Sequence, residues 1–163
     1  MKLLLMNHVT DKWILWYHSI NDNQWGKGSY QKIHEINNLY DYQYIHDIFK
    51  QDHYQNGMFF CMKEGIFPNW EDPDNRSGGC LSFKVTSIKV IDEWNTLLLK
   101  CITNQILNEH NEEINGISIS PKKEFNIVKI WFKDNDFEYK KYFESEKDSL
   151  ISLENSLYKK HEF

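Results

Sequence analysis

Short apolar and aromatic runs, separated by clusters of turn-forming residues, dominate the hydrophobic pattern of this chain. Runs of this length that are rich in β-branched and aromatic residues are typical of β-strands. The pattern predicts strands at Lys12–Tyr17, Ser29–Glu35, Met58–Lys63, Cys80–Val85, Ile114–Ser120 and Asn126–Phe132. A turn at Pro121–Phe125 would join the last two strands as a hairpin. Polar loops rich in Asn, Asp, Gly and Pro separate the others.

Apolar residues at steps of three and four predict three amphipathic helices. They involve Leu39, Tyr42, Ile45, Ile48 and Phe49, then Ile91, Trp94, Leu97, Leu98 and Cys101, and finally Leu150, Ile151, Leu153, Leu157 and Tyr158. Phe137–Phe143 fits either a strand or a helix. Strands joined by short turns with interspersed helices predict an α+β fold, in which helices cover one face of an antiparallel sheet. We expect a single domain over residues 1–163, with residues 1–7 as a short N-terminal extension.

The charge of the chain argues against a general nucleic-acid binder, which would show a basic face. Net charge is −5 over 163 residues, and Arg76 is the only arginine. Cys61, Cys80 and Cys101 are odd in number and form no CxxC pair, so a reducing compartment is the simplest interpretation. No apolar run approaches membrane-spanning length. We therefore expect a cytoplasmic protein that has no contact with membranes.

The sequence contains no pattern typical of an enzyme or a metal site. His34, His46 and His53 share one segment, but their spacing does not match HExxH. No GxSxG, P-loop or GxGxxG motif occurs. We expect a protein without catalytic activity, metal or cofactor.

Two tryptophans differ from the others in their surroundings. Trp13, Trp16 and Trp94 lie in periodic apolar segments, where core packing is the ordinary role, and the same holds for Trp131. Trp25 and Trp70 lie instead in polar, turn-rich loops, where binding residues concentrate. Either ring could equally fold back onto the body of the protein.

Two facing indoles would form a slot for a flat ligand. Stacking of a base on an aromatic ring contributes about 1–3 kcal/mol, and a positive charge on the base adds about 0.5–2 kcal/mol per ring. Glu71, next to Trp70, could accept two hydrogen bonds from the edge of a guanine, although most loop glutamates are simply solvated. Lys122 and Lys123 in the predicted hairpin could meet phosphates, but paired surface lysines alone are weak evidence.

Several motifs together resemble the eukaryotic translation initiation factor 4E family, the proteins that bind the 5′ cap of mRNA. The similarity runs from about His8 to Trp131. It is carried by Trp13–Tyr17, Trp25, Gly65–Asp72, Asn75 with Gly78–Gly79, Trp94 with Leu97–Leu99, Asn115–Ile117 and Ile130–Trp131. The resemblance implies a curved antiparallel sheet backed by three helices. We expect about six strands, where the family has eight, because the chain ends where the third predicted helix ends.

The resemblance also implies roles for individual residues. Trp25 and Trp70 match the two tryptophans that stack on 7-methylguanine, Glu71 matches the acid that reads the guanine edge, and Trp131 matches the residue near the methyl group. Lys122 falls on a phosphate-contacting arginine.

The phosphate end departs from the family pattern. A second phosphate-contacting arginine is replaced by Cys80, and a lysine by Glu124. Lys123 or Arg76 could substitute. We therefore expect weaker or differently arranged triphosphate binding.

The surface that receives the scaffold factor 4G or repressors also differs. The resemblance places this surface at His8, Leu39, Tyr42, Gln43, Asn95 and Leu99. Gln43 occupies the position of a family tryptophan, and Asn95 with Thr96 replaces a Leu-Glu pair, whereas Leu99 is retained.

The resemblance implies a protein that binds the 7-methylguanosine cap and supports recruitment of capped mRNA to translation initiation, with a scaffold of the 4G type as partner. One alternative is a translational repressor that sequesters caps without recruiting the usual scaffold. Another is a degenerate fold that serves only as a protein-interaction module.

Overall fold

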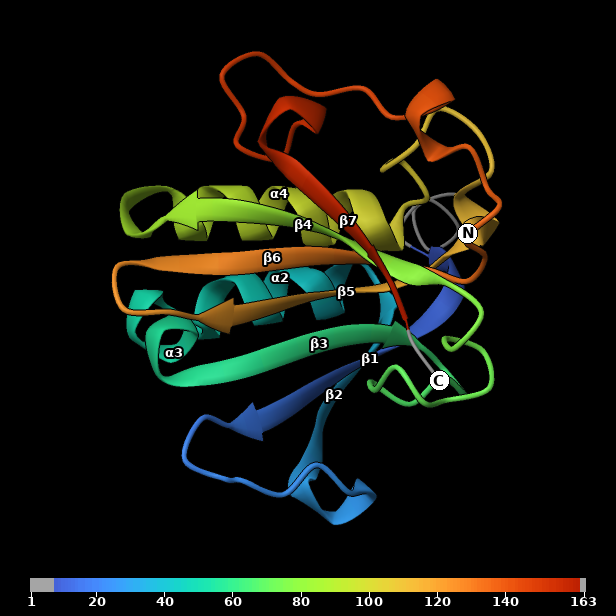
Figure 1. Ribbon diagram of the computed structural model, residues 1–163. Helices are drawn as coiled ribbons and strands as arrows, with labels where there is room; N and C mark the ends of the chain where they lie inside the picture. The colour runs from blue at the N-terminus through green and yellow to red at the C-terminus, as the bar shows by residue number, and fades with distance from the viewer. Residues whose placement is uncertain (1–7, 162–163) are drawn as a thin grey trace.

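A seven-stranded antiparallel sheet forms the body of the computed structural model, which describes residues 8–161 (Figure 1). The strands are β1 (His8–Ser19), β2 (Tyr30–Asn38), β3 (Gly57–Lys63), β4 (Gly79–Thr86), β5 (Ile114–Pro121), β6 (Phe125–Phe132) and β7 (Ser156–Lys160). Their order across the sheet is β2-β1-β3-β5-β6-β4-β7. The predicted N-terminal extension at 1–7 lies outside the described residues, as does the side chain of His8.

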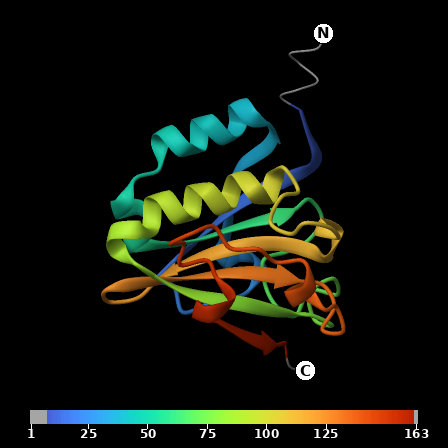
Figure 2. The same cartoon turned by 90° about the horizontal axis from the view of Figure 1, so that it is seen from above.

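The helices lie together on one face of the sheet (Figure 2). They are α2 (Leu39–Ile48), α3 (Gln51–Asn56) and α4 (Val90–Ile102), and single 3-10 turns occur at Lys27–Ser29, Ser87–Lys89, Asn111–Glu113, Tyr139–Lys141 and Leu153–Asn155. Asn38 caps α2, since its side-chain oxygen accepts a hydrogen bond of 3.0 Å from the Asp41 backbone N–H. Trp94 and Leu98 of α4 are fully buried against the sheet. The main hydrophobic core therefore fills the space between the helices and this face.

The predicted α+β class, with a sheet backed by three helices, is confirmed. All six predicted strands are present, most of them one to a few residues longer than the apolar run that indicated them. The sheet gains β7, so the estimate of about six strands was one too low. The short helix α3 was not anticipated, because six residues are too few to show a helical period.

The predicted C-terminal helix is wrong: residues 156–160 form strand β7, which pairs with β4. The segment before it is anchored by polar contacts to distant elements. Glu93 on α4 accepts hydrogen bonds from the Ser149 hydroxyl (2.8 Å) and the Leu150 backbone N–H (3.2 Å). Asn155 donates to the Lys84 carbonyl at 2.9 Å. These contacts and the unpaired edge of β4 override the three- and four-residue spacing of the leucines.

The ambiguous segment Phe137–Phe143 is neither a strand nor an α-helix. It forms turns around the 3-10 turn Tyr139–Lys141 and ends in an isolated β-bridge between Phe143 and Leu107. Its aromatic rings pack on the end of β6, where the Tyr139 ring stacks at 5.3 Å on Phe132.

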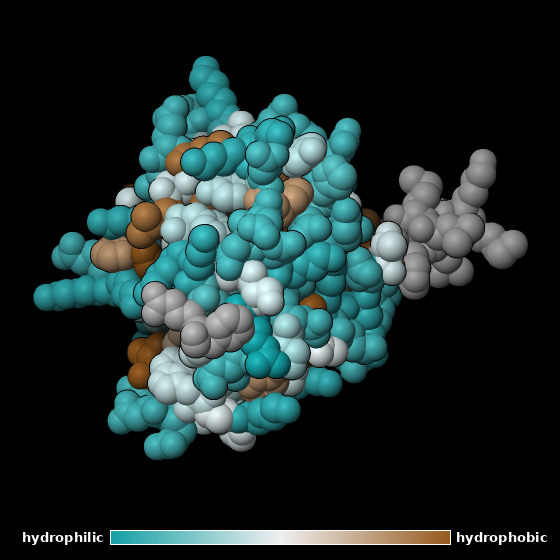
Figure 3. Space-filling model, turned by 45° about the vertical axis from the view of Figure 1, so that its right-hand side comes forward, coloured by the Kyte–Doolittle hydropathy of each residue, from teal (hydrophilic) through white to brown (hydrophobic). Residues whose placement is uncertain are grey.

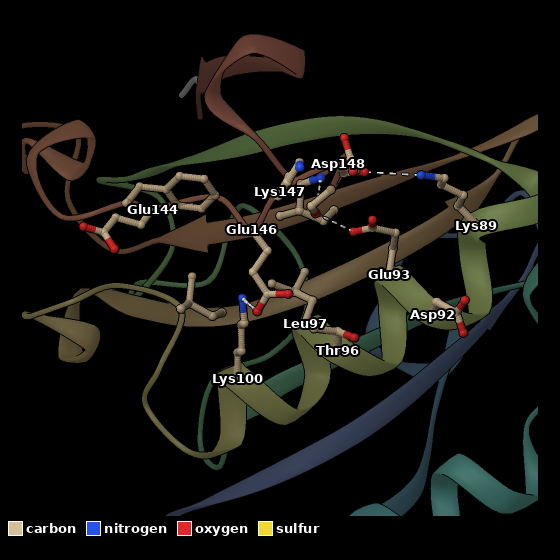
Figure 4. A pocket seen from close by; sticks show the side chains of 14 residues that line it. Lys89, Asp92, Glu93, Thr96, Leu97, Lys100, Glu144, Glu146, Lys147 and Asp148 are labelled. Atoms are coloured by element: carbon tan, nitrogen blue, oxygen red, sulfur yellow. Dashed lines mark hydrogen bonds and ion pairs between the residues drawn. The ribbon is translucent and has the colours of Figure 1, made fainter.

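A pocket of about 270 Å³ lies where α4 meets the segment that leads to β7 (Figure 4). Charged side chains line its rim, and Lys89, Glu93, Lys100 and Glu146 among them have hydrogen-bond or ion-pair partners. Lys100 forms an ion pair of 2.6 Å with Glu146, and Lys89 donates to the Asp148 carbonyl at 3.2 Å. These contacts therefore hold the C-terminal segment against α4.

Hydrophilic residues cover most of the face shown in Figure 3, and hydrophobic residues appear there as small, separate patches. None of the helices in the described part of the chain is long and apolar enough to cross a membrane.

Glu93→Ala should destabilise the protein by about 1–3 kcal/mol, because it leaves the Ser149 hydroxyl and the Leu150 N–H without their acceptor. Urea unfolding monitored by tryptophan fluorescence would measure the change. Asp92→Ala on the same helical turn is the matched control and should lose only about 0.3–1 kcal/mol of helix-dipole stabilisation. Equal losses in the two variants would contradict the anchoring role of Glu93.

Candidate nucleotide-binding site

The face of the sheet opposite the helices carries a second apolar cluster, which we call the helix-free face cluster. Its buried members are Tyr30, Phe60, Met62, Cys80 and Trp131, and Trp16, Met58, Ile66 and Phe67 pack against them. Successive side chains of a strand point to opposite faces. On β6, Ile130 and Phe132 therefore enter the main core, whereas Trp131 joins the helix-free face cluster.

A cavity of about 360 Å³ opens above this cluster. It is lined by Trp70, Cys80, Ser82, Lys129, Trp131, Lys159, Lys160 and His161. Trp131 forms part of its floor: its ring is 6% exposed, and its indole N–H donates to the Ser118 hydroxyl at 3.0 Å. The cavity thus combines indole surfaces with three lysines.

The loop that carries Trp70 and Glu71 is braced from within. The buried Asn75 donates from its amide to the carbonyls of Phe67 (3.0 Å) and Asn69 (2.8 Å). Asn115 on β5 donates to the Asn75 side-chain oxygen at 2.9 Å, which ties the loop to the sheet. Because its buried polar groups are satisfied, the loop can present an indole that is 39% exposed without collapsing onto the body.

Trp25 lies on the loop between β1 and β2, and its side chain is 53% exposed. One face of its indole stacks on His18, with ring centroids 4.1 Å apart and planes 6° apart. Trp25 therefore folds back onto the body of the protein with one face of its ring only, and the other face stays open.

Tyr30 connects the two loops. Its ring lies 6.4 Å from that of Trp25 and 4.9 Å from that of Phe67, at the start of the loop that carries Trp70. Burial, and secondarily the negative charge of Glu71, raises the pKa of Tyr30 to about 12. The exposed Glu71 carboxylate thus lies close enough to Tyr30 to act on it electrostatically.

The structure brings Trp70 and Trp131 to one cavity but does not include Trp25 in its described lining. Lys122, Lys123 and Arg76 are exposed, and they too are missing from the described lining. Lys122 sits in the β5–β6 turn, where its backbone N–H donates to the Phe125 carbonyl at 2.8 Å.

Sequence reasoning missed the lysines that do line the cavity. Lys129 could have been found, because it lies two residues before Trp131 on the same strand and so on the same face. Lys159 and Lys160 could not, because their segment was assigned to a helix.

Cys80 and His161 form a neutral pair at the wall of the cavity. The His161 Nδ1–H donates to the Asn75 carbonyl at 2.8 Å, so its Nε2 is free to accept from the Cys80 thiol at 3.3 Å. Burial raises the pKa of Cys80 to about 12 and lowers the pKa of His161. The positive charge of the cavity therefore comes from its lysines. Within residues 8–161 no group of His, Cys, Asp and Glu side chains is arranged to hold a metal ion.

Comparison with known proteins identifies the family of this fold and site. The family model described as "Eukaryotic initiation factor 4E" matches residues 8–162. The chain belongs to the eukaryotic initiation factor 4E family. The predicted resemblance is confirmed over nearly the whole sequence.

Individual members of the initiation factor 4E family share modest identity with the chain. Factor 4E of Candida albicans is 40% identical over 48% of this chain and 39% of its own length. Factor 4E-3 of Caenorhabditis elegans is 23% identical over 82% of this chain and 56% of its own length. Isoform 4E of Nicotiana tabacum is 29% identical over 75% of this chain and 63% of its own length. The chain thus spans between 39% and 63% of the length of these relatives.

Solved structures of family members share the fold. The Caenorhabditis elegans eIF4E-3 in complex with the 4E-binding protein Mextli superimposes with a TM-score of 0.71 at 21% identity, over 79% of this chain and 76% of that one. The Ascaris suum eIF4E-3 in complex with an m7G cap gives a TM-score of 0.71 at 21% identity, over 80% and 76%.

A groove of about 560 Å³ on the helical side of this 4E-family fold contains part of the predicted partner surface. It brings together Tyr42 of α2 with Asn95 and Leu99 of α4, and the Tyr42 hydroxyl donates to the Asn95 carbonyl at 3.0 Å. Leu99 is 37% exposed there. Gln43 is exposed, is missing from the described lining of the groove, and donates to the Asp47 carboxylate at 2.9 Å, whereas Leu39 packs against the core.

Proposed function

We propose that this 4E-family protein binds the 7-methylguanosine cap of mRNA on its helix-free face and supports recruitment of capped mRNA to translation initiation. Family membership and the likeness to a relative solved with an m7G cap support the proposal. The observation that carries it is the position of Trp70, which lies on a braced loop directly before Glu71 and lines one cavity with Trp131. We also infer one binding domain without catalytic activity, acting in the cytoplasm.

In this proposal the methylated base stacks between the open face of Trp25 and the ring of Trp70. Methylation at N7 makes the base a cation, and a cation is attracted to the face of an indole. The Glu71 carboxylate accepts hydrogen bonds from N1–H and N2–H of the guanine, and the Trp70 backbone N–H donates to O6. Trp131 lies near the methyl group.

The phosphates of the cap would extend toward the lysines of the cavity. Lys129, Lys159 and Lys160 supply positive charge where the family arginine is replaced by Cys80. Lys122, Lys123 and Arg76 remain candidates for the outer phosphates, because all three are exposed cations. A lysine offers a point charge rather than the bidentate fork of an arginine, so the contacts to the phosphates are arranged differently.

We infer that the groove of Tyr42, Asn95 and Leu99 receives a scaffold protein of the 4G type. The likeness to a relative solved with a 4E-binding protein supports a partner on this fold. Leu99 is exposed in the groove, but the position of the family tryptophan on α2 is occupied by Gln43, so we expect a weaker or divergent partner. A cap-sequestering repressor would keep the slot and lack this recruitment.

Trp70→Ala and Trp25→Ala should each lower the affinity for 7-methyl-GTP about 10- to 100-fold, because each removes one stacking and cation–π partner. Isothermal titration calorimetry would measure the loss. Tyr44→Ala, an exposed aromatic residue on α2, is the control and should bind normally. Undiminished binding by Trp70→Ala would rule out the proposed slot.

Lys129→Gln and Lys160→Gln should each weaken 7-methyl-GTP about three- to tenfold and leave the 7-methylguanosine nucleoside almost unaffected, since only the triphosphate meets their charge. Lys122→Gln tests the sequence-based assignment in the same assay. Lys140→Gln, outside the described lining of the cavity, is the control. A loss no larger than that of Lys140→Gln would exclude Lys129 and Lys160 from phosphate binding.

Gln43→Trp should strengthen retention of a 4G-type peptide about tenfold or more, because it restores the large aromatic side chain that the family resemblance places on this surface. Leu99→Asp should abolish whatever retention the wild type shows. A peptide pull-down with cap affinity measured in parallel provides the readout, and cap affinity should stay constant. Tight retention by the wild type, unaffected by Leu99→Asp, would place the partner elsewhere.

A further inference from the structure

His18 on β1 has two hydrogen-bond partners that can only accept. Its ring is fully buried. Nδ1 lies 2.8 Å from the Ser19 carbonyl oxygen, and Nε2 lies 2.8 Å from the Gln24 carbonyl oxygen. Both distances are those of good hydrogen bonds, and each needs a hydrogen on the ring nitrogen. A neutral imidazole carries one such hydrogen, whereas an imidazolium carries two.

A neutral His18 would leave one of these contacts repulsive. In either tautomer, the nitrogen lone pair of one ring atom would face a carbonyl oxygen at 2.8 Å. Because the side chain has no exposed surface, no solvent can replace the lost partner. The geometry of both nitrogens therefore matches the doubly protonated ring.

The indole of Trp25 provides further stabilisation for a charge at this position. Its face lies 4.1 Å from the His18 ring and nearly parallel to it, well within cation–π range. The Tyr30 ring lies 4.8 Å from the His18 ring in a T-shaped arrangement. Two carbonyl dipoles and one π-face thus surround the ring.

The charged groups on the elements packed around His18 have other partners. On the Trp25 loop, Asp22 accepts from the Gln24 backbone N–H at 2.8 Å, and Lys27 lies 5.7 Å from the Phe67 ring. Glu71 acts on Tyr30, which is the β2 residue opposite His18. Strand β3 contributes the neutral Met58 opposite His18.

We propose that His18 is an imidazolium that positions Trp25 and sets how strongly the slot prefers a positively charged base. It holds the Gln24 carbonyl and the Trp25 ring together, so the open indole face is presented to any flat base. A cation stacked on that open face is repelled by the charge behind the indole. This inference rests on the proposed function, since it assumes that Trp25 stacks on the base.

The charge of His18 can be tested without any ligand. Ring ¹⁵N NMR of the free, labelled protein at pH 7 should show a hydrogen on both nitrogens of His18, assigned by the loss of its signals in His18→Phe. One non-protonated ring nitrogen would overturn the proposal. A neutral histidine that served only as a packing residue would give that result.

The effect on selectivity is tested by the ratio of affinities for 7-methyl-GTP and GTP, measured by competition with a fluorescent cap analogue at pH 6.5. In His18→Phe, Trp25 loses its anchor, so the affinity for GTP should fall. Loss of the positive charge behind the indole offsets this fall for the cationic 7-methyl-GTP only, so the ratio of the 7-methyl-GTP affinity to the GTP affinity should rise about three- to tenfold. His18→Gln, also neutral, should raise the ratio too. His110→Asn is the control, because asparagine tolerates the left-handed backbone found at His110 (φ 66°).

An unchanged ratio in both neutral variants would overturn the effect on selectivity. Failure of the wild type to bind either nucleotide would instead overturn the proposed function and, with it, the selectivity. The ring signals of the free protein would still decide the charge of His18, so the two failures are distinguishable.

Discussion

The alternation of side chains along a strand is the constraint on which both halves of this protein depend. Antiparallel sheets commonly bury one face and expose the other to water. Here each face carries an apolar cluster. The main core lies between the sheet and the helices, and the helix-free face cluster lies on the opposite face. On β6 the boundary runs between neighbouring residues: Ile130 and Phe132 enter the main core, and Trp131 faces the site. A slip of register by one residue would exchange the core and the site.

The rest of the site is added to that framework by segments that the sheet holds in place. Asn115 on β5 holds the loop of Trp70 through its hydrogen bond to Asn75. The sheet therefore positions both this loop and the floor of the cavity. Strand β7 adds lysines at the far edge, and Glu93 on the helical side fixes the segment that leads to it. The position of the proposed phosphate end therefore depends on packing on both faces of the sheet.

Local patterns were enough to predict most of the fold. Each apolar run became a strand, and Ile91 to Cys101 gave the helix α4, because these signals reflect which face of an element is buried. The helix predicted from the C-terminal leucines was wrong because β7 is specified by pairing with β4, whose partner residues lie 73 to 81 positions earlier in the chain, and long-range pairing leaves no local period. For the site, the loop tryptophans and Glu71 were visible through motif similarity. The lysines of β7 and the role of His18 required knowing which segments lie side by side.

In the proposed complex, the methylated base of the cap lies on the helix-free face between Trp25 and Trp70. A crystal structure of the protein with 7-methyl-GTP tests it most directly. The base should lie between the two indoles, with the Glu71 carboxylate on its N1–H and N2–H edge and the phosphates pointing toward Lys129 and Lys160. A base bound elsewhere, or stacked on only one of the two rings with Glu71 turned to solvent, would contradict it.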